Sequence, residues 1–135
     1  MSEIRDDLPD SFLRKILNVE YKMRLPELIL QKIDYSTMSQ SVEARSHGIP
    51  LVVNHLCGML GLFFSSEERI DNLEAVKRSD TARFARFFHH MLDAGVNLAP
   101  SAFEAIFIGS QHNAAVIDAT LAAADRAFAK LAQEN

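Results

Sequence analysis

The chain has 135 residues, of which 48% are hydrophobic and 24% are charged, and its formal net charge is -4 at pH 7. This length suits one domain with its own hydrophobic core. The net negative charge gives no indication of a basic surface for binding nucleic acid. The single cysteine excludes an internal disulfide and fits a reducing compartment, and no apolar run is long enough to span a bilayer.

The first 26 residues begin with acidic side chains and no apolar run, so they do not read as a secretory signal and we expect a cytoplasmic protein. Asp10 or Ser11 is suited to cap a short helix that ends near Tyr21. A second helix is expected over Pro26–Ser46, because proline suits a first helical turn. Gly48 is well placed to end that helix.

Two strands are expected next, at Leu51–Asn54 and Cys57–Ser65, since both runs are apolar and are followed by turn residues. Gly58 and Gly61 allow a bulge or a close backbone approach in the second strand.

Two helices follow the strands. The first is expected at Leu73–Arg78 with Asn72 as its cap, and the second at Thr81–Ala94 with Ser79 or Asp80 as its cap. Gly95 should end the second helix. Its apolar residues recur at helical spacing and predict a buried stripe, which consists of Phe84, Phe87, Phe88, Met91 and Leu92.

The C-terminal part is expected to contain a short extended segment at Val96–Leu98, a strand at Phe103–Gly109 and a helix at Ala114–Gln133. Asn113 is suited to cap that helix. Its apolar stripe consists of Ile117, Leu121, Ala124, Phe128 and Leu131.

This order of elements predicts an α+β fold. We expect a small, mostly antiparallel sheet of three to four strands with helices packed on one face, plus an extra N-terminal helix. The other face of such a sheet is available for a partner.

The five histidines and the single cysteine do not form a metal-binding pattern. His89 and His90 are consecutive on an expected helix, about 100° apart, so they cannot chelate one metal together, and we expect no metal site. His55 and Cys57 would share one face of a regular strand, which leaves open a thiol nucleophile with a nearby base. A small buried residue at the start of a strand is the more common role for such a cysteine.

Glu104 is the most informative ionisable residue, because it lies in the apolar stretch AFEAIFI. A carboxylate in such a stretch is either turned out to water or held inside by a partner. On a regular strand Glu104 would share a face with Ile106 and Ile108.

Three segments together resemble a known family: CGMLGLFF from Cys57, SDTARFARFFHHMLDAGV from Ser79, and LAPSAFEAIFIGSQH from Leu98. They are similar to the C-terminal small domain of glutamate-1-semialdehyde 2,1-aminomutase, a class III aminotransferase family that uses pyridoxal phosphate (PLP). The resemblance covers about two thirds of the chain. We therefore divide the chain into residues 27–135, an aminotransferase-like small domain, and residues 1–26, an unmatched helical appendage.

In that family the third segment usually reads LAPSxFEAGF and is followed shortly by a histidine. The resemblance implies that Glu104 faces the active site, near the cofactor and the substrate amine. Ser101 and His112 are weaker substrate-binding candidates, with local structure as the simpler role for both. The chain departs from the pattern at Ile106, where the family has glycine, and at Asn97, where it has tyrosine.

A PLP enzyme needs a lysine for the cofactor, an acid for the pyridine nitrogen and a phosphate cup. None of the five lysines lies in a segment that resembles the family's cofactor lysine. We therefore expect no cofactor-binding residues and no independent catalysis here, although the family converts glutamate-1-semialdehyde to 5-aminolevulinate in tetrapyrrole biosynthesis.

Three functions remain open. The first is an aminomutase-like small domain, as a fragment, chimera or diverged relative, whose partner is a missing large domain. The second is a self-associating interaction module that reuses the small-domain fold. The third is an unrelated enzyme built around His55, Cys57 or Glu104. In the first two, the N-terminal helix would cover part of an exposed apolar surface through Phe12, Leu13, Ile16 and Leu17.

Overall fold

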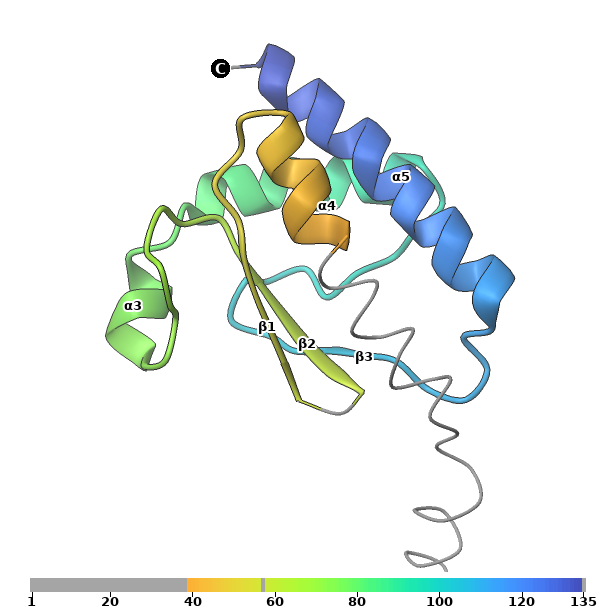
Figure 1. Cartoon of the computed structure of the whole chain (residues 1–135), viewed down its shortest axis with the longest axis horizontal. Coiled ribbons are helices and arrows are strands. Elements are labelled where there is room, and N and C mark those ends of the chain that lie inside the picture. Colours follow the sequence, from red (N-terminus) through yellow and green to blue (C-terminus); the bar gives the residue numbers. More distant parts are fainter. Residues whose placement is uncertain (1–38, 57, 135) are drawn as a thin grey trace, which may run out of the picture.

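The structure is a computed structural model that describes residues 39–56 and 58–134 (Figure 1). Our expectations for the N-terminal helix, for most of the second helix and for Cys57 fall outside these residues. The division of the chain at residue 26 also lies outside them.

Within the described part, the chain forms a helix over residues 39–46 and then six further elements. These are β1 (Val52–Leu56), β2 (Met59–Phe63), α3 (Leu73–Lys77), α4 (Thr81–Asp93), β3 (Ile106–Phe107) and α5 (Ala114–Gln133). The predicted α+β class is confirmed, since the strands form one three-stranded sheet in the order β1-β2-β3 with every pair antiparallel.

The register of the sheet separates two faces, because directly opposed residues in antiparallel strands point to the same side. The inner face carries Val53, Leu60, Leu62 and Ile106. The outer face carries Val52, Asn54, Leu56, Met59, Gly61, Phe63 and Phe107.

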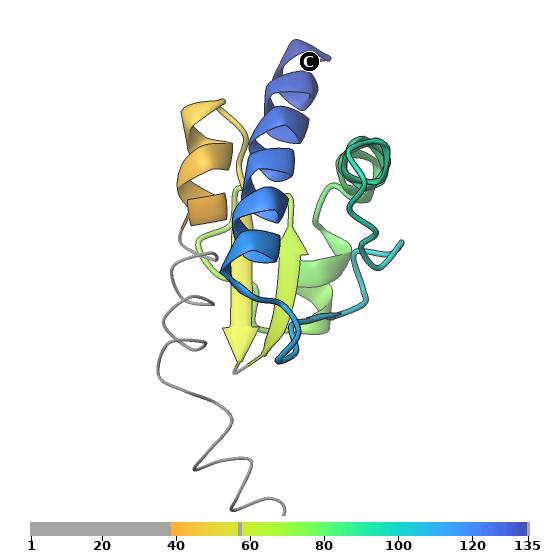
Figure 2. The same ribbon diagram turned by 90° about the vertical axis from the view of Figure 1, so that its right-hand side faces the viewer.

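Helices cover the inner face, with helix 39–46 and α5 side by side (Figures 1 and 2). Phe64 follows β2 and packs edge-on against Phe87 of α4, with ring centroids 5.5 Å apart, and against Phe128 of α5 at 6.5 Å. The rings of Phe87 and Phe128 are stacked, with centroids 4.9 Å apart. Each such aromatic pair stabilises the fold by about 0.5–1.5 kcal/mol beyond its burial, so this cluster joins the sheet to both long helices.

The outer face is less covered. The short helix α3 lies on the far side of the β1–β2 hairpin from α5 (Figure 1). The loop that precedes it is linked to β1 by Asn54, whose side-chain Nδ2 donates to the Ile70 carbonyl at 2.5 Å. The predicted open face is therefore present, with α3 at its border.

The predicted helix boundaries are confirmed by their caps. The side chains of Asn72, Asp80 and Asn113 each accept a hydrogen bond from the backbone N–H three residues later. Gly48 and Gly95 follow helices with φ values of 72° and 86°, a left-handed conformation that glycine adopts without steric cost.

Two strand predictions were wrong. The segment expected as a strand at Phe103–Gly109 contains only Ile106–Phe107 as a strand, because a turn over residues 101–104 precedes it. Val96–Leu98 forms no strand, although Val96 and Leu98 pack against the core.

The buried stripe of α4 is narrower than predicted. Phe84, Phe87 and Met91 are buried, whereas Leu92 is 46% exposed.

In the described residues, no helix is long and apolar enough to cross a membrane.

Candidate functional site

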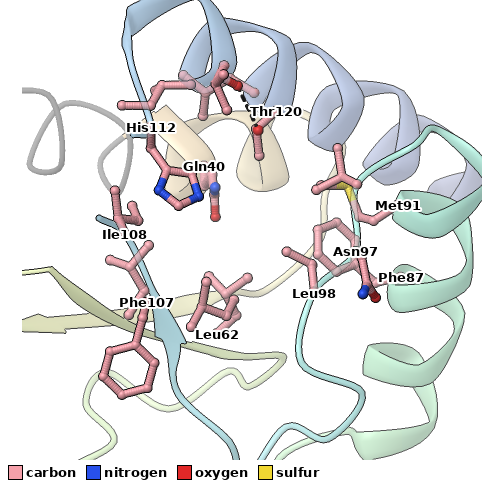
Figure 3. Close-up of a pocket in the computed structure, with 16 residues that line it drawn as sticks. Gln40, Leu62, Phe87, Met91, Asn97, Leu98, Phe107, Ile108, His112 and Thr120 are labelled. Atoms are coloured by element: carbon pink, nitrogen blue, oxygen red, sulfur yellow. Dashed lines mark hydrogen bonds between the residues drawn. The ribbon is translucent and has the colours of Figure 1, made fainter. Parts of the chain in front are cut away.

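The segment from Leu98 to His112 borders two depressions that lie on different sides of the sheet. The outer hollow, about 320 Å³, lies between the outer face, α3 and residues 102–105. The inner cavity, about 150 Å³, lies between the inner face, α4 and the start of α5 (Figure 3).

Ser101 shapes the turn that leads into β3. Its hydroxyl oxygen accepts a hydrogen bond from the Phe103 N–H at 3.2 Å, and its carbonyl accepts one from the Glu104 N–H at 3.1 Å. Serine hydroxyls commonly stabilise turns in this way. The geometry therefore gives Ser101 a clear local structural task, and that turn presents Glu104 at the outer hollow.

Glu104 is exposed and borders the outer hollow. Among the described residues, its carboxylate makes no hydrogen bond or ion pair. A carboxylate without an internal partner at the edge of an apolar hollow is available to a cation or to an N–H group from another molecule.

Exposed apolar side chains lie on the same side of the sheet as the outer hollow. Phe107 is 70% exposed, Leu56 is 67% exposed and Phe103 is 54% exposed. These residues, together with Met59 and Leu73, form what we call the outer apolar patch. Exposed apolar surface of this kind is typical of interaction sites.

His112 lies elsewhere. It lines the inner cavity, and its Nδ1 accepts a hydrogen bond from the Gly109 N–H at 2.9 Å. Glu104 and His112 thus border different depressions, and the structure does not bring these two candidate residues into one site.

The outer hollow does not fit PLP. The described residues that line it include no lysine, so none can hold the cofactor covalently, and they include no arginine, serine or threonine of the kind that forms a phosphate cup. The two lysines in the described part, Lys77 and Lys130, line neither depression. Lys77 instead pairs with Glu74 at 2.8 Å.

Of the other histidines that the sequence singled out, His90 joins two helices. His90 Nε2 lies 2.9 Å from Glu134 Oε1, and Arg86 Nε lies 3.4 Å from Glu134 Oε2, so both α4 residues contact the C-terminal end of α5. The ring of His89 contacts Phe88. The expected nucleophile pair is incomplete here, because His55 is exposed at the end of β1 while Cys57 lies outside the described residues.

The sequence alone did not predict one further cluster. His47 Nε2 lies 2.9 Å from Asp125 Oδ1, and one ligand atom from each of Glu43, His47 and Asp125 lies within 4.8 Å of the others. The three residues could hold a metal ion, and as they stand they link helix 39–46 to α5. The spacing of Glu43 and His47, four residues apart on a helix, was the available signal, whereas Asp125 is remote in sequence.

Ile106, which replaces the family's glycine, is accommodated as a regular strand residue. It pairs with Leu60 and packs against the hydrophobic core. The Ile106 side chain therefore contributes apolar packing at a position where the family has a glycine, which has no side chain.

Comparison with known proteins supports the resemblance. The chain is 54% identical over 88 residues to the glutamate-1-semialdehyde 2,1-aminomutase of Dichelobacter nodosus (strain VCS1703A). The aligned stretch makes up 65% of this chain and 21% of that enzyme, so the chain spans about a fifth of the length of the curated relative it matches. No established family profile matches the chain.

A solved structure shares the fold. The FumI protein of Sphingopyxis sp. MTA144, determined in its PLP internal aldimine form, superimposes with a TM-score of 0.64 and 18% identity. The match covers 87% of this chain and 25% of the FumI chain. The resemblance to the aminomutase family is confirmed, and it fits a C-terminal portion of such an enzyme.

Proposed function

We propose that this chain is an aminomutase-like small domain that has no catalysis of its own and acts only with a PLP-binding large domain. Residues 27–135 would form the small domain and residues 1–26 an appendage to it. The observation that carries the proposal is the match itself, which is 54% identical yet corresponds to 21% of the enzyme.

The outer hollow supports the same proposal. It offers a carboxylate, Glu104, but no lysine, arginine, serine or threonine among the described residues that line it. The chemistry supplied by PLP would therefore reside in the partner domain. Glu104 would contribute negative charge near the substrate amine, and the outer apolar patch would be covered by that domain.

Reconstitution tests this proposal. The Dichelobacter nodosus enzyme, truncated to remove the 88 residues that match this chain, would be mixed with the full 135-residue chain and PLP. The expected result is conversion of glutamate-1-semialdehyde to 5-aminolevulinate by the mixture and by neither component alone. Glu104→Gln should lower the rate about 10- to 100-fold, the range for losing one charge-assisted hydrogen bond.

Glu68→Gln is the matched control, because Glu68 is an exposed carboxylate outside the outer hollow. It should leave the rate of the mixture unchanged. Turnover by the 135-residue chain with PLP alone would refute the proposal. A mixture in which the two components bind each other but Glu104→Gln has no effect would refute the role of Glu104.

The outer apolar patch also favours a second function, a stand-alone interaction module that associates with a second copy of itself. Phe103 and Phe107 are more than half exposed, and neighbouring exposed apolar residues extend the same surface. Covering such a surface with a second copy would remove it from water without any large domain.

A further inference from the structure

The inner cavity has the construction of a small-molecule site and plays no part in the function proposed above. Its floor consists of the buried side chains of Leu62, Phe87, Met91 and Ile117. Its volume is about 150 Å³, which is about the size of an apolar cavity that holds one benzene molecule. Figure 3 shows Leu62, Phe87 and Met91 around a common space, with the ring of Phe107 pointing away from it.

One buried polar atom in this cavity has no partner. Gln40 is 9% exposed and lines the cavity, and its Oε1 is buried without a hydrogen-bond partner in the described part of the chain. The large majority of buried polar side-chain atoms in proteins are paired, so an orphan acceptor facing a cavity indicates a missing donor. A single buried water typically makes about three hydrogen bonds. The apolar floor of the cavity provides few partners for a water molecule.

Of the other polar residues that line the cavity, which are Asn97, His112 and Thr120, two have a hydrogen-bond partner within their own segment. Thr120 Oγ1 donates to the Val116 carbonyl at 2.8 Å, and His112 Nδ1 accepts from the Gly109 N–H. The described lining contains no aspartate, glutamate, lysine or arginine. A bound molecule would therefore meet a mainly apolar wall, the unpaired acceptor of Gln40, a few further uncharged polar groups and no side chain of fixed charge, which selects for a neutral compound.

We propose that the inner cavity binds a small neutral molecule that is mainly apolar, has about the size of one aromatic ring, and carries one hydroxyl that donates to Gln40 Oε1. Phenol is the simplest probe of this class, and toluene has nearly the same shape without a donor. This proposal does not depend on a large domain or on Glu104, so the reconstitution experiment and this one can fail separately.

Binding would be measured on the full chain by following backbone amide NMR signals during titration with each probe. Phenol is expected to shift the signals of residues that line the inner cavity, with a Kd of about 1 mM, as suits so small a ligand. Gln40→Met keeps the side-chain length and removes the acceptor. It should weaken phenol binding about tenfold, the effect of losing one hydrogen bond, and change toluene binding less than about twofold.

Gln133→Met is the matched control, because Gln133 is an exposed glutamine at the end of α5 and lies outside the cavity. It should change neither affinity. The proposal is overturned if phenol leaves the signals of the cavity residues unchanged up to about 10 mM, ten times the expected Kd. It is equally overturned if Gln40→Met weakens phenol and toluene alike, since Gln40 would then shape the cavity without accepting from the ligand.

Discussion

Glu67 shows how a single contact sets the ionisation of a surface residue. Arg78 Nε donates to Glu67 Oε1 at 2.7 Å, and Arg78 Nη2 donates to Glu67 Oε2 at 3.1 Å. This two-point hydrogen bond from Arg78 lowers the pKa of the Glu67 carboxyl below its ordinary value. A carboxyl whose folded pKa is lowered stabilises the fold above its unfolded pKa, and that contribution is lost as the pH falls through the folded pKa.

Replacing Arg78 with methionine should therefore raise the pKa of Glu67 towards its ordinary value, which an NMR titration of the Glu67 side chain would measure. The variant should be slightly less stable than the wild type at neutral pH, and the difference should vanish in acid. Arg126→Met is the control, because Arg126 is exposed on α5 and borders a different depression from the one that Glu67 lines. An unchanged Glu67 pKa in the Arg78 variant would contradict this assignment.

Residue-scale features differ in how far the sequence predicts them. The caps at Asn72, Asp80 and Asn113 were predictable because each side chain bonds to the backbone three residues later. Turn formation by Ser101 was likewise local. The orphan oxygen of Gln40 was not predictable, because its burial depends on helices that are distant in sequence.

At the scale of elements, Gly58 determines how closely β3 approaches β2. A Cβ at this position would lie 2.7 Å from the Ile108 carbonyl oxygen, and the Ile108 N–H donates to the Gly58 carbonyl. The Gly58→Ala variant must therefore displace backbone atoms of the segment that follows β3. We expect its free energy of unfolding to fall by about 1–3 kcal/mol, the usual cost of overpacking.

Gly109→Ala is the control for this prediction, because a Cβ there would meet its nearest neighbour, His112 Nδ1, at 3.9 Å. Its stability should stay within about 0.5 kcal/mol of the wild type. Both variants would be compared by chemical denaturation. Equal stability of the two variants would show that the close contact at Gly58 does not constrain β3.

The helices were predicted better than the strands for a physical reason. The spacing of apolar residues and the capping residues of α4 and α5 both lie in or next to each helical segment. Their boundaries therefore differ little from the expected ones. Strand β3 depends on its pairing with Met59 and Leu60. An apolar run in the sequence does not show which of its residues pair with a neighbouring strand. The segment around Glu104 was therefore predicted as a longer strand than the one that forms.

At the scale of the whole molecule, we expect the outer apolar patch to govern association. If the stand-alone function holds, sedimentation should show that the chain dimerises as its concentration rises. The double variant Phe103→Ser, Phe107→Ser should then remain monomeric, because it removes the two largest exposed rings of the patch. Val42→Ser is the control, since Val42 is 62% exposed on helix 39–46 and lies outside the patch.

A wild-type chain that stays monomeric at every concentration would exclude the self-associating module. The reconstitution with a large domain would still decide the first proposal.

The order of elements was enough to predict the α+β class. The pairing of His47 with Asp125 and the position of the inner cavity were not predictable, because both arise from contacts between remote parts of the chain.

The stretch from Ala102 to Ile108 has a double role in space, since its first residues border the outer hollow and its last residues border the inner cavity. It is thus a common wall between two compartments. Thermodynamic reciprocity requires that a compound which moves this wall from one side alters affinity on the other side by the same factor. A ring-sized alcohol that moves this wall from the interior should therefore also change the affinity of any assembly at the opposite surface by that factor.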